Sequence, residues 1–515
     1  MATPTTSGPV SGVPLSGNSF IDSLVSGFKW GGPAGSGVTV SFSFPYSSGS
    51  AYWSTDPYVG YGPASETGEP WDSFGLSSLQ QAAFRIAVQR WANVANITFT
   101  ETVDNQSTVG DVRIAFTNNF DYPSSSGYAY YPSSYPTGGD IWLDASDYWS
   151  LFNTVNSGSY GFLTLLHEIG HAIGLKHPFE GSYVLPESLD EVGLTVMSYT
   201  DASGYPDSSL SFYPTTPMWY DIMALQYVYG PNMSYHSGND TYVFNANQNY
   251  FETIWDAGGI DTIQYVSSFQ GGTIDLRPGH WSQLGLERQI FTSGGTRVSS
   301  DTVNTYGTVL IENAIGGNGP DTIIGNDVAN SLIGGGGVDT AVYSGNHAAN
   351  TITKTASGYI VSGPEGNDTL SNIERLKFSD KSLAVDMAVS EAGGKTALLL
   401  GACLGANGLS DKAIVGGILD YFDGGYTLTD AATALVDAGI VAQLAGGADN
   451  QHFVDWMALN LVDALPDAST EAVLIEFITS GQFTQATFLA TLAAHQINQD
   501  HIGLTGLQDN GMEFV

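Results

Sequence analysis

Hydrophobic residues recur at helical spacing early in the chain. Across residues 76–94 the apolar positions mostly fall three or four residues apart, which predicts an amphipathic helix. These positions are Leu79, Ala83, Ile86, Ala87, Trp91 and Val94. Shorter runs rich in apolar and β-branched residues predict strands at 96–102, 111–117 and 138–144. Residues 19–230 therefore predict a mixed α+β block.

The pattern changes after residue 232, where a short motif recurs. It consists of glycine, any residue, aspartate and threonine, followed by a mostly apolar residue. The copies are GNDTY at Gly238, GIDTI at Gly259, GPDTI at Gly319, GVDTA at Gly337 and GNDTL at Gly366. Across residues 316–342 the period becomes nine, as GGNGPDTII, GNDVANSLI and GGGGVDTAV. This pattern is typical of calcium-binding nonapeptide repeats.

Geometry explains why such repeats bind calcium. Glycines let the chain turn and expose its carbonyls, aspartates add carboxylates, and calcium takes six to eight oxygen ligands. We expect the apolar positions Ile323, Leu332 and Ala341 to point inward between short parallel strands. The middle turn has Asn326 and Asn330 at motif positions, so one calcium position is expected to be weak or empty. The alternative is a metal-free, glycine-rich β segment.

From about residue 390 the chain becomes rich in alanine and leucine. Helical periodicity predicts helices at 427–444, 452–465 and 469–479, in a separate helical domain. The only cysteine, Cys403, lies in this part and excludes an internal disulfide. Its apolar neighbours predict an inert, buried thiol.

The chain has 51 acidic and 14 basic residues, a formal net charge of −37. Nucleic acid and anionic membranes would be repelled, whereas cations are natural partners. Residues 1–19 are polar and show no signal-peptide pattern, and no apolar run reaches transmembrane length. If the protein is exported, we therefore expect a route that needs no cleaved N-terminal signal.

The strongest chemical signal is HEIGHAIGLKHP at residues 167–178. On a helix, His167 and His171 share one face and can reach the same tetrahedral metal, while Glu168 can reach a metal-bound water. His177 can join them only if the helix stops, and Gly174 permits the required chain reversal. Three histidines with one open position are typical of a catalytic zinc.

These residues resemble the serralysin family of metzincin zinc endopeptidases, over residues 15–380. Besides the zinc motif, the matching stretches are TVMSY, WYDIMALQYVYG, WDAGGIDTI and IENAIGG followed by GNDVAN. The resemblance implies an α+β zinc-protease domain and then a calcium-binding parallel β-roll or β-sandwich domain. The α-helical part after residue 389 is not part of the minimal family.

The resemblance also implies roles for individual residues. Met197 would form an apolar floor under the histidines, and Tyr199 would be a movable zinc ligand with a catalytic role beside Glu168. The segment 139–144, GDIWLD, would be the edge strand that aligns substrate. The implied calcium ligands are His236, Gly238, Asp240, Asp256, Gly258, Gly259, Asp261, Glu312, Gly317, Gly319, Asp321, Gly335, Gly337 and Asp339.

Together these observations predict four segments. They are an N-terminal segment or short propeptide at 1–18, a zinc metalloprotease domain at 19–231, a calcium-binding β-roll domain at 232–388 and a helical domain at 389–515. By resemblance we expect type I secretion to the extracellular space through an uncleaved C-terminal signal. We expect a monomer that inserts into no membrane and binds no nucleic acid.

The predicted activity is hydrolysis of protein and peptide bonds by metal-activated water, with Glu168 as general base. Its cofactors would be Zn²⁺ and several Ca²⁺ ions. Two alternatives remain at this point. One is a calcium-dependent surface or adhesion protein with a vestigial zinc site, and the other is a zinc hydrolase of a non-peptide substrate.

Overall fold

The structure is a computed structural model that describes residues 9–63, 68–119, 125–205 and 207–515. Residues 1–8 of the predicted segment 1–18 therefore lie outside the described residues. Two compact units divide the chain. The first unit comprises residues 1–261 and 278–311, and the second unit comprises residues 262–277 and 312–515.

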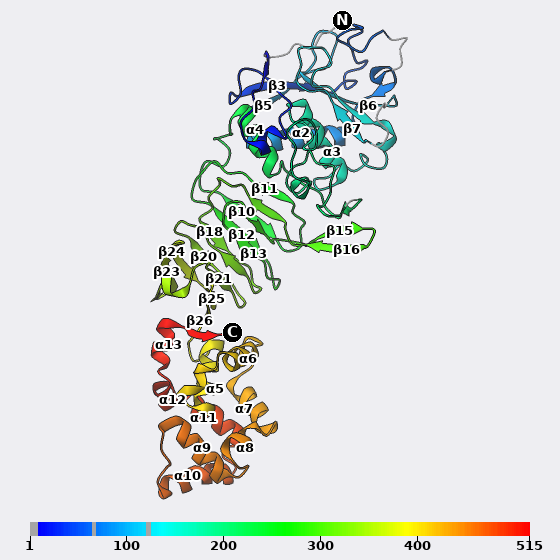
Figure 1. The fold of residues 1–515 in the computed structure, drawn as a ribbon. Coiled ribbons are helices and arrows are strands. Elements are labelled where there is room, and N and C mark those ends of the chain that lie inside the picture. Colours follow the sequence, from blue (N-terminus) through cyan, green and yellow to red (C-terminus); the bar gives the residue numbers. More distant parts are fainter. Residues whose placement is uncertain (1–8, 64–67, 120–124, 206) are drawn as a thin grey trace. The chain divides into compact units, whose positions relative to one another are not determined.

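A six-stranded sheet forms the frame of the first unit (Figure 1). Its path runs β5-β3-β6-β8-β7, and β4 pairs with β6 beside this path. β3, β5, β6 and β8 are parallel, whereas β7 and β4 run antiparallel to their partners. The bounds are β3 (Val38–Ser43), β4 (Ser73–Phe74), β5 (Ile97–Glu101), β6 (Val112–Thr117), β7 (Gly127–Ala129) and β8 (Ile141–Asp144).

The three strands predicted for this block are confirmed, with shorter ends. One assignment is wrong: the segment 139–144 is not the edge strand, because β8 lies between β6 and β7. Gly138 and Gly139 form a turn, and the chain then enters the sheet beside a strand that precedes it in sequence. Among the described residues, β7 is the last strand of this sheet.

Four α-helices belong to the first unit. They are α1 (Ser19–Asp22), α2 (Ser78–Val94), α3 (Tyr160–Ala172) and α4 (Trp219–Tyr229). The predicted helix at 76–94 is confirmed as α2, which begins with a capping box between Ser77 and Gln80. The Trp91 indole N–H donates to the Leu166 carbonyl, 3.1 Å away, and so joins α2 to α3.

The buried face of α2 differs in part from the predicted one. Leu79 and Ile86 are 52% and 48% exposed, whereas Phe84 and Val88 belong to the core. Phe84 joins the helix to the sheet by packing against the rings of Phe42 and Phe44. Spacing alone does not distinguish these two overlapping faces.

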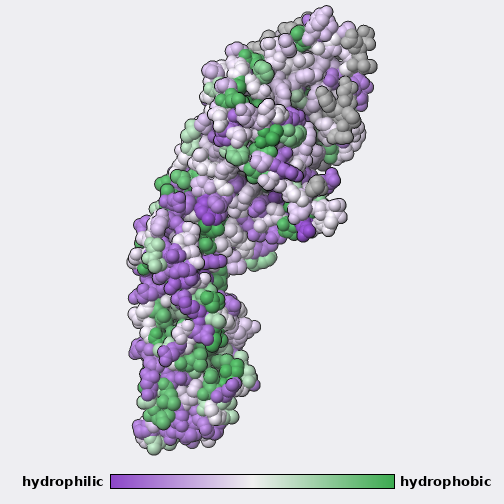
Figure 2. Space-filling model, viewed as in Figure 1, coloured by the Kyte–Doolittle hydropathy of each residue, from purple (hydrophilic) through white to green (hydrophobic). Residues whose placement is uncertain are grey.

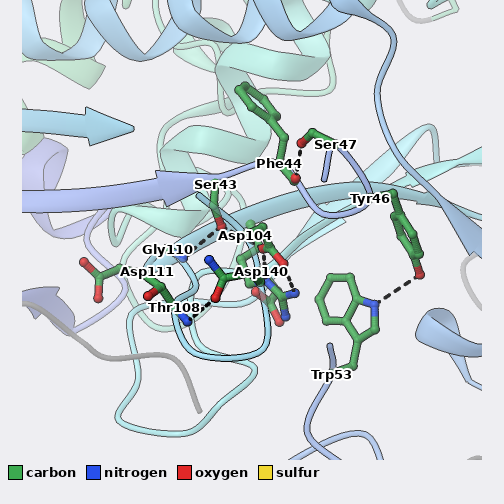
Figure 3. A network of polar contacts seen from close by, with 12 residues as sticks. Ser43, Phe44, Tyr46, Ser47, Trp53, Asp104, Thr108, Gly110, Asp111 and Asp140 are labelled. Atoms are coloured by element: carbon green, nitrogen blue, oxygen red, sulfur yellow. Dashed lines mark hydrogen bonds and ion pairs between the residues drawn. The ribbon is translucent and has the colours of Figure 1, made fainter. Parts of the chain in front are cut away.

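A buried ion pair fastens the loops to the sheet (Figure 3). The Arg113 guanidinium donates to both Asp104 carboxylate oxygens at 2.9 and 3.0 Å, and it lies 3.8 Å from the centre of the Trp53 ring. The Ser43 hydroxyl donates to Asp104 and accepts from the Gly110 N–H, each at 2.8 Å. Because both charges are buried and paired, loss of either partner would be costly.

The rest of the first unit consists of small sheets. Their paths are β1-β2, β11-β17-β14 and β16-β15-β9, and β10 is a further strand. The bounds are β1 (Val10–Gly12), β2 (Phe28–Trp30), β9 (Ser209–Leu210), β10 (Thr241–Asn245), β11 (Glu252–Ile254), β14 (Trp281–Ser282), β15 (Arg288–Thr292), β16 (Gly295–Ser299) and β17 (Val303–Thr305).

In the second unit, short strands alternate between two sheets. Along one sheet the order is β12-β18-β20-β24-β23-β22, and along the other it is β13-β19-β21-β25-β26-β27. The first sheet contains β12 (Thr262–Val266), β18 (Asn313–Ile315), β20 (Ser331–Ile333), β22 (Thr351–Thr355), β23 (Gly358–Gly363) and β24 (Gly366–Ser371). The second contains β13 (Thr273–Asp275), β19 (Thr322–Ile324), β21 (Thr340–Val342), β25 (Arg375–Lys377), β26 (Ser382–Ala384) and β27 (Met512–Phe514).

The nonapeptide stretch produces this alternation. β18, β19, β20 and β21 follow one another in the chain, and β18 pairs in parallel with β20 as β19 does with β21. The apolar positions Ile323, Leu332 and Ala341 are all buried, as the repeat predicts. The residues 316–342 therefore form a regular stack of turns, here called the repeat stack.

Helices make up most of the chain after residue 391. They are α5 (Ala392–Leu404), α6 (Lys412–Asp423), α7 (Leu428–Asp437), α8 (Ile440–Ala445), α9 (Asn450–Val462), α10 (Ala468–Thr479), α11 (Gln485–Ala493), α12 (Gln496–His501) and α13 (Leu504–Asn510). The single helix predicted at 427–444 is wrong, because Gly439 adopts a φ of 73° and separates α7 from α8. Short 3-10 turns lie at Glu69–Asp72, Ala145–Asp147, Glu187–Leu189, His347–Ala349 and Ala406–Ser410.

Two features complete this unit. Cys403 is buried, and burial raises the pKa of its thiol to about 12, in agreement with the predicted inert cysteine. The strand β27 pairs antiparallel with β26, so residues on either side of the helices are neighbours in one sheet. Within the described part of the chain, no helix is both long and apolar enough to span a membrane.

Candidate metal centre

Helix α3 carries the motif histidines through the core of the first unit. It begins at Ser159, whose hydroxyl caps the Phe162 N–H, and from Gly161 onward every residue of the helix is buried. His167 and His171 lie one turn apart, with ring centres separated by 4.7 Å. The helix thus presents two imidazoles on one face, as the sequence predicts.

The chain reverses directly after the helix. Gly174 has a φ of 106°, a conformation that favours glycine. A Cβ atom at this position would lie 2.3 Å from the Phe28 carbonyl oxygen, so no larger residue fits there without movement. This turn brings His177 back to the other two histidines and confirms the predicted reversal.

The three imidazoles converge through their Nε2 atoms. His177 Nε2 lies 3.1 Å from His167 Nε2 and 3.0 Å from His171 Nε2. These three residues, here called the histidine cluster, form one of two groups of potential ligands with donor atoms within 4.8 Å of one another in the described chain. Such a separation suits three ligands of one small cation.

Every Nδ1 atom of the histidine cluster faces an oxygen acceptor. The pairs, each 2.8 Å apart, are His167 with the Val196 carbonyl, His171 with the Leu175 carbonyl and His177 with the Glu180 carboxylate. When Nδ1–H donates in each pair, all three Nε2 atoms carry lone pairs. Lone pairs that meet at this distance repel one another unless a cation lies between them, so the cluster fits zinc.

Burial favours the neutral form of His167 and His171. It lowers the pKa of His167 to about 3 and holds the pKa of His171 well below its ordinary value, with neighbouring imidazoles adding to both shifts. A neutral imidazole is the form that binds a metal. These two imidazoles can therefore bind a metal at ordinary pH without losing a proton.

Glu168 is the one buried acid of the motif. Its side chain is 3% exposed, and its Oε2 atom has no hydrogen-bond partner among the described residues. Burial raises the pKa of this carboxyl well above the usual range, and a nearby cation would act in the opposite direction. A Cβ atom on Gly127 of β7 would lie 3.1 Å from the Glu168 carboxylate, so only glycine leaves this approach open.

A tight turn lies beneath the histidine cluster. Met197 is fully buried, and a Cβ atom on Gly170 would come within 2.4 Å of its sulfur. The floor predicted for Met197 therefore packs against α3 at a glycine. Sequence reasoning assigned no role to Gly170, although it lies inside the motif.

Asp221 holds this turn in place, and sequence reasoning missed its role. Its carboxylate accepts from the Thr195 hydroxyl at 2.6 Å, and from the Val196 and Met218 N–H groups at 2.8 Å each. It is fully buried, which raises its pKa to about 7. The available signal was a single acid in the otherwise apolar stretch WYDIMALQ.

Aromatic rings frame the open side of the histidine cluster. The Tyr199 ring centre lies 4.6 Å from that of His177 and 5.5 Å from that of His167. Phe179 stacks on His177 at 5.0 Å with nearly parallel planes. Tyr199 is 64% exposed, so its ring can move without disturbing the core.

A pocket of about 260 Å³ opens beside His167 and Glu168. The end of β7, one face of α3 and the turn after Met197 supply its walls. They include Ser126, Gly127, Leu163, Val192, Tyr199 and Asp201. An extended chain laid along β7 would therefore pass directly over the buried carboxylate.

A second group of ligand residues lies elsewhere in the first unit. His236, Asp240 and Asp256 have donor atoms within 4.8 Å of one another, and His236 Nδ1 lies 2.9 Å from Asp240 Oδ1. The Asp256 carboxylate accepts from the Gly258 N–H at 2.6 Å, and Asp261 accepts from the Asp240 N–H at 2.7 Å.

Glycines bring this second group close together. A Cβ atom on Gly259 would lie 2.0 Å from the Gly238 carbonyl oxygen and 2.8 Å from an Asp261 carboxylate oxygen. Gly258 has a φ of 127°, which favours glycine. The structure thus gathers all seven of the ligands predicted between His236 and Asp261 in this first-unit cluster.

The repeat stack aligns buried carboxylates in a column. Asp321 accepts from the Gly317 N–H at 2.6 Å, and Asp339 accepts from the Asp321 N–H at 2.8 Å. Glu374 continues the column by accepting from the Asp339 N–H at 2.8 Å. No repeat motif marks Glu374, so the sequence did not reveal it. The other Asp339 oxygen, Oδ2, is buried and has no hydrogen-bond partner among the described residues.

Glycine carbonyls line the same column. A Cβ atom on Gly335 would lie 2.0 Å from the Gly317 oxygen, and one on Gly337 would lie 2.7 Å from the Gly319 oxygen. Successive turns therefore place their carbonyls and glycines in contact. Such spacing supplies the carbonyl oxygens that calcium requires.

Glu312 and the middle turn lie in a different column. The Asn330 amide donates to the Glu312 carbonyl at 3.1 Å and to the Asn326 side chain at 2.9 Å. The Asn330 N–H donates to Asp368 at 2.9 Å. An amide that satisfies its neighbours in this way leaves less negative charge for a cation, which agrees with the predicted weaker position.

Parts of the chain match two known families. Residues 74–204 match the family model for Matrixin, and residues 220–400 match the model for Peptidase M10 serralysin C terminal. The first match contains the histidine cluster, and the second contains the predicted calcium ligands. Together they support a serralysin-type metzincin, a class of zinc metalloendopeptidases.

Individual relatives agree with this class. Serralysin from Proteus mirabilis is 35% identical over 291 residues, which cover 50% of this chain and 56% of the relative. Serralysin C from Dickeya chrysanthemi is 34% identical over 289 residues, covering 51% and 56%. Metalloprotease AprA from Pseudomonas entomophila is 32% identical over 285 residues, covering 50% and 55%. The chain thus spans little more than half the length of these relatives.

Proposed function

We propose that this protein is a secreted zinc endopeptidase that hydrolyses peptide bonds in extended substrates. One observation carries the proposal: three imidazole Nε2 atoms converge beside a buried glutamate carboxylate that has an unpartnered oxygen and faces a pocket. The Matrixin match and the serralysin relatives support the same activity.

His167, His171 and His177 would hold the zinc, and Tyr199 would reach it as a movable fourth protein ligand. When bound, zinc would act as a Lewis acid that polarises the scissile carbonyl and lowers the pKa of water, so that the water becomes a good nucleophile. Glu168 takes the proton from that water and later gives it to the leaving amine. Tyr199 lies against the cluster rings, from where its hydroxyl can move to the developing oxyanion.

The substrate would align along β7. This strand is the last of its sheet among the described residues, and an extended peptide would pair with its outer edge. Gly127 lies against Glu168, so a peptide on this edge passes over the catalytic carboxylate. The neighbouring pocket of about 260 Å³ would receive one substrate side chain.

Calcium would bind separately at two groups, the carboxylate column of the repeat stack and the ligand cluster of the first unit, and would stabilise each of them. The three acids Asp321, Asp339 and Glu374 follow one another through backbone N–H groups, so their negative charges accumulate along one line. Burial raises the pKa of each of the three carboxyls, which means that their ionised forms are disfavoured without a nearby cation. Calcium would supply that compensation and so contribute to folding.

The proposed site of action is extracellular. Export would use the type I secretion machinery and an uncleaved C-terminal signal, as the family resemblance implies. Protein and peptide substrates would be met outside the cell, where calcium is abundant enough to fill the repeat stack.

Casein digestion tests the proposal. The purified chain with calcium and one equivalent of zinc should digest casein, lose this activity with a zinc chelator, and regain it when zinc is restored. Glu168→Ala should retain bound zinc while the rate falls by at least about 10²–10⁴-fold, because the general base is lost. The matched control is Glu187→Ala, an exposed acid in the 3-10 turn Glu187–Leu189.

Two outcomes would contradict the proposal. A zinc-loaded wild-type protein that cleaves neither casein nor a mixed peptide library would favour the calcium-dependent surface or adhesion protein. Full activity in Glu168→Ala would remove the general base from the proposed reaction, even if zinc proved essential.

A further inference from the structure

The helical segment contains an apolar pocket that the proposed protease does not use. Its volume is about 350 Å³, within the range of ligand sites, and α9, α10, α11 and α12 supply its walls. The side chains that matter for its character are Met457, Leu461, Leu474, Phe488, Leu492 and Ile497. We call it the helical pocket.

The helix α10 covers this pocket incompletely. Its sequence contains AVLI and FI, yet none of its residues is buried. Val473 is 54% exposed, and at the mouth of the pocket Val462 and Leu465 are 51% and 60% exposed. Figure 2 shows hydrophobic patches among hydrophilic residues over this part of the chain. Surface of this kind commonly marks a site of interaction.

Charge restricts what can bind there. Residues 389–515 contain fifteen Asp and Glu but only two basic residues, Lys395 and Lys412. Asp467 lines the helical pocket, and Asp463 lies in the same linker between α9 and α10, with its side chain 80% exposed and 3.2 Å from His501 Nε2. Neither lysine lines the pocket. An anionic membrane, a fatty acid carboxylate or a second acidic copy of this chain would be repelled.

We propose that the helical pocket is a docking site for a basic amphipathic helix of a partner protein. Apolar residues one helical turn apart would fill the pocket, and lysine or arginine beside them would meet Asp463 and Asp467. The recognition needs both properties, because the walls are apolar and the mouth is acidic. This inference is independent of the proposed peptidase activity.

Binding of labelled helical peptides to the full chain tests the inference. The protein carries Glu168→Ala to prevent digestion and is loaded with zinc and calcium. The probes are an 18-residue leucine/lysine amphipathic helix, a leucine/glutamate helix of identical pattern, and a scrambled leucine/lysine peptide. Fluorescence anisotropy should show the first binding at least about tenfold more tightly than either of the others.

Variants at the mouth locate the site. The double variant Val462→Gln with Leu465→Gln should weaken binding about tenfold, and these exposed positions can change without loss of the fold. The matched control is Leu459→Gln, on the same helix and 48% exposed but outside the pocket, which should bind as before. Asp463→Asn keeps a residue that tolerates its left-handed conformation, and it should weaken binding about threefold and reduce the salt dependence.

Three results would overturn the inference. Equal affinity for the scrambled peptide would mean attraction by charge alone. Unchanged affinity in the double variant would place the binding elsewhere. Tighter binding of neutral phosphatidylcholine vesicles than of the leucine/lysine helix would indicate a lipid site in place of a protein docking site.

Discussion

The histidine cluster and the carboxylate column are both candidate metal centres, but they are built in opposite ways. The histidines come from eleven consecutive residues, and an acceptor holds the Nδ1 atom of each. The carboxylates come from separate turns and carry like charges that meet in the interior. The fold holds the histidine cluster in place, whereas repulsion within the carboxylate column destabilises the fold.

This difference indicates what each metal does. A site whose imidazoles are held by second partners can persist without its metal, so bound zinc would contribute chemistry more than structure. A column of largely buried acids is unfavourable without cations, so bound calcium would contribute structure more than chemistry. The two metals should therefore be separable by experiment.

Selective metal removal should produce the largest contrast. Removal of zinc alone should abolish hydrolysis and leave hydrogen exchange of residues 312–385 unchanged. Removal of calcium should greatly accelerate exchange in the same residues, because each site with calcium at 1,000 times its dissociation constant adds about 4 kcal/mol. Equal protection with and without calcium would remove the structural role assigned to the column.

The turn beneath the histidine cluster should depend strongly on Asp221. Asp221→Ala leaves the Thr195 hydroxyl and two backbone N–H groups without their buried acceptor, and it should lower the free energy of unfolding by about 3 kcal/mol. Tryptophan fluorescence during urea unfolding measures this change. Asp221→Asn keeps one acceptor oxygen, so its free energy of unfolding should fall by less. An equal fall in both variants would mean that the charge of Asp221, and not its hydrogen bonds, stabilises the turn.

The hydrogen bond to His177 should tune zinc affinity without affecting the fold. Glu180→Gln removes the carboxylate that orients the imidazole, and zinc affinity should fall about tenfold. Competition with a coloured chelator measures the affinity, and Glu187→Gln serves as the exposed control. An unchanged affinity would mean that the chain reversal at Gly174 alone positions His177.

The smallest effect expected is a pH dependence of the metal-free protein. Burial raises the pKa of Asp339 to about 7, whereas an unfolded aspartate titrates near about 3.9. The unfolded state therefore ionises first, and stability of the second unit should fall as pH rises from about 4 to about 7. Hydrogen exchange at pH 5 and 8, corrected for intrinsic rates, should show this loss, and Asp339→Asn should reduce it. A steeper loss in the variant would refute the assignment.

The sequence predicted the histidine cluster well because its geometry is local. His167 and His171 lie on one face of a single helix because they are four residues apart. Gly174 indicates the chain reversal that brings His177 to them. Asp221 escaped notice because two of its three partners, Thr195 and Val196, are more than twenty residues away in the chain. A contact of that kind leaves no periodic signal.

The sheet and the helices show where pattern reading fails. GDIWLD has the composition of a strand, but its place in the sheet depends on β7, which comes earlier and is only three residues long. In the helical segment, alanine and leucine continue across Gly439, so periodicity alone joined two helices into one. The strands of the repeat stack were predicted closely because each turn repeats the same short pattern of glycine and apolar positions.

The pairing of β26 with β27 has a consequence for how this chain can change. Ala384 lies opposite Met512, so everything between them leaves and returns at neighbouring points of one sheet. In evolutionary terms, the block of helices is an insertion between the two strands of a β hairpin. The Arg375–Asp423 ion pair also joins this block to β25, so replacing the helices would leave a buried guanidinium with one partner fewer.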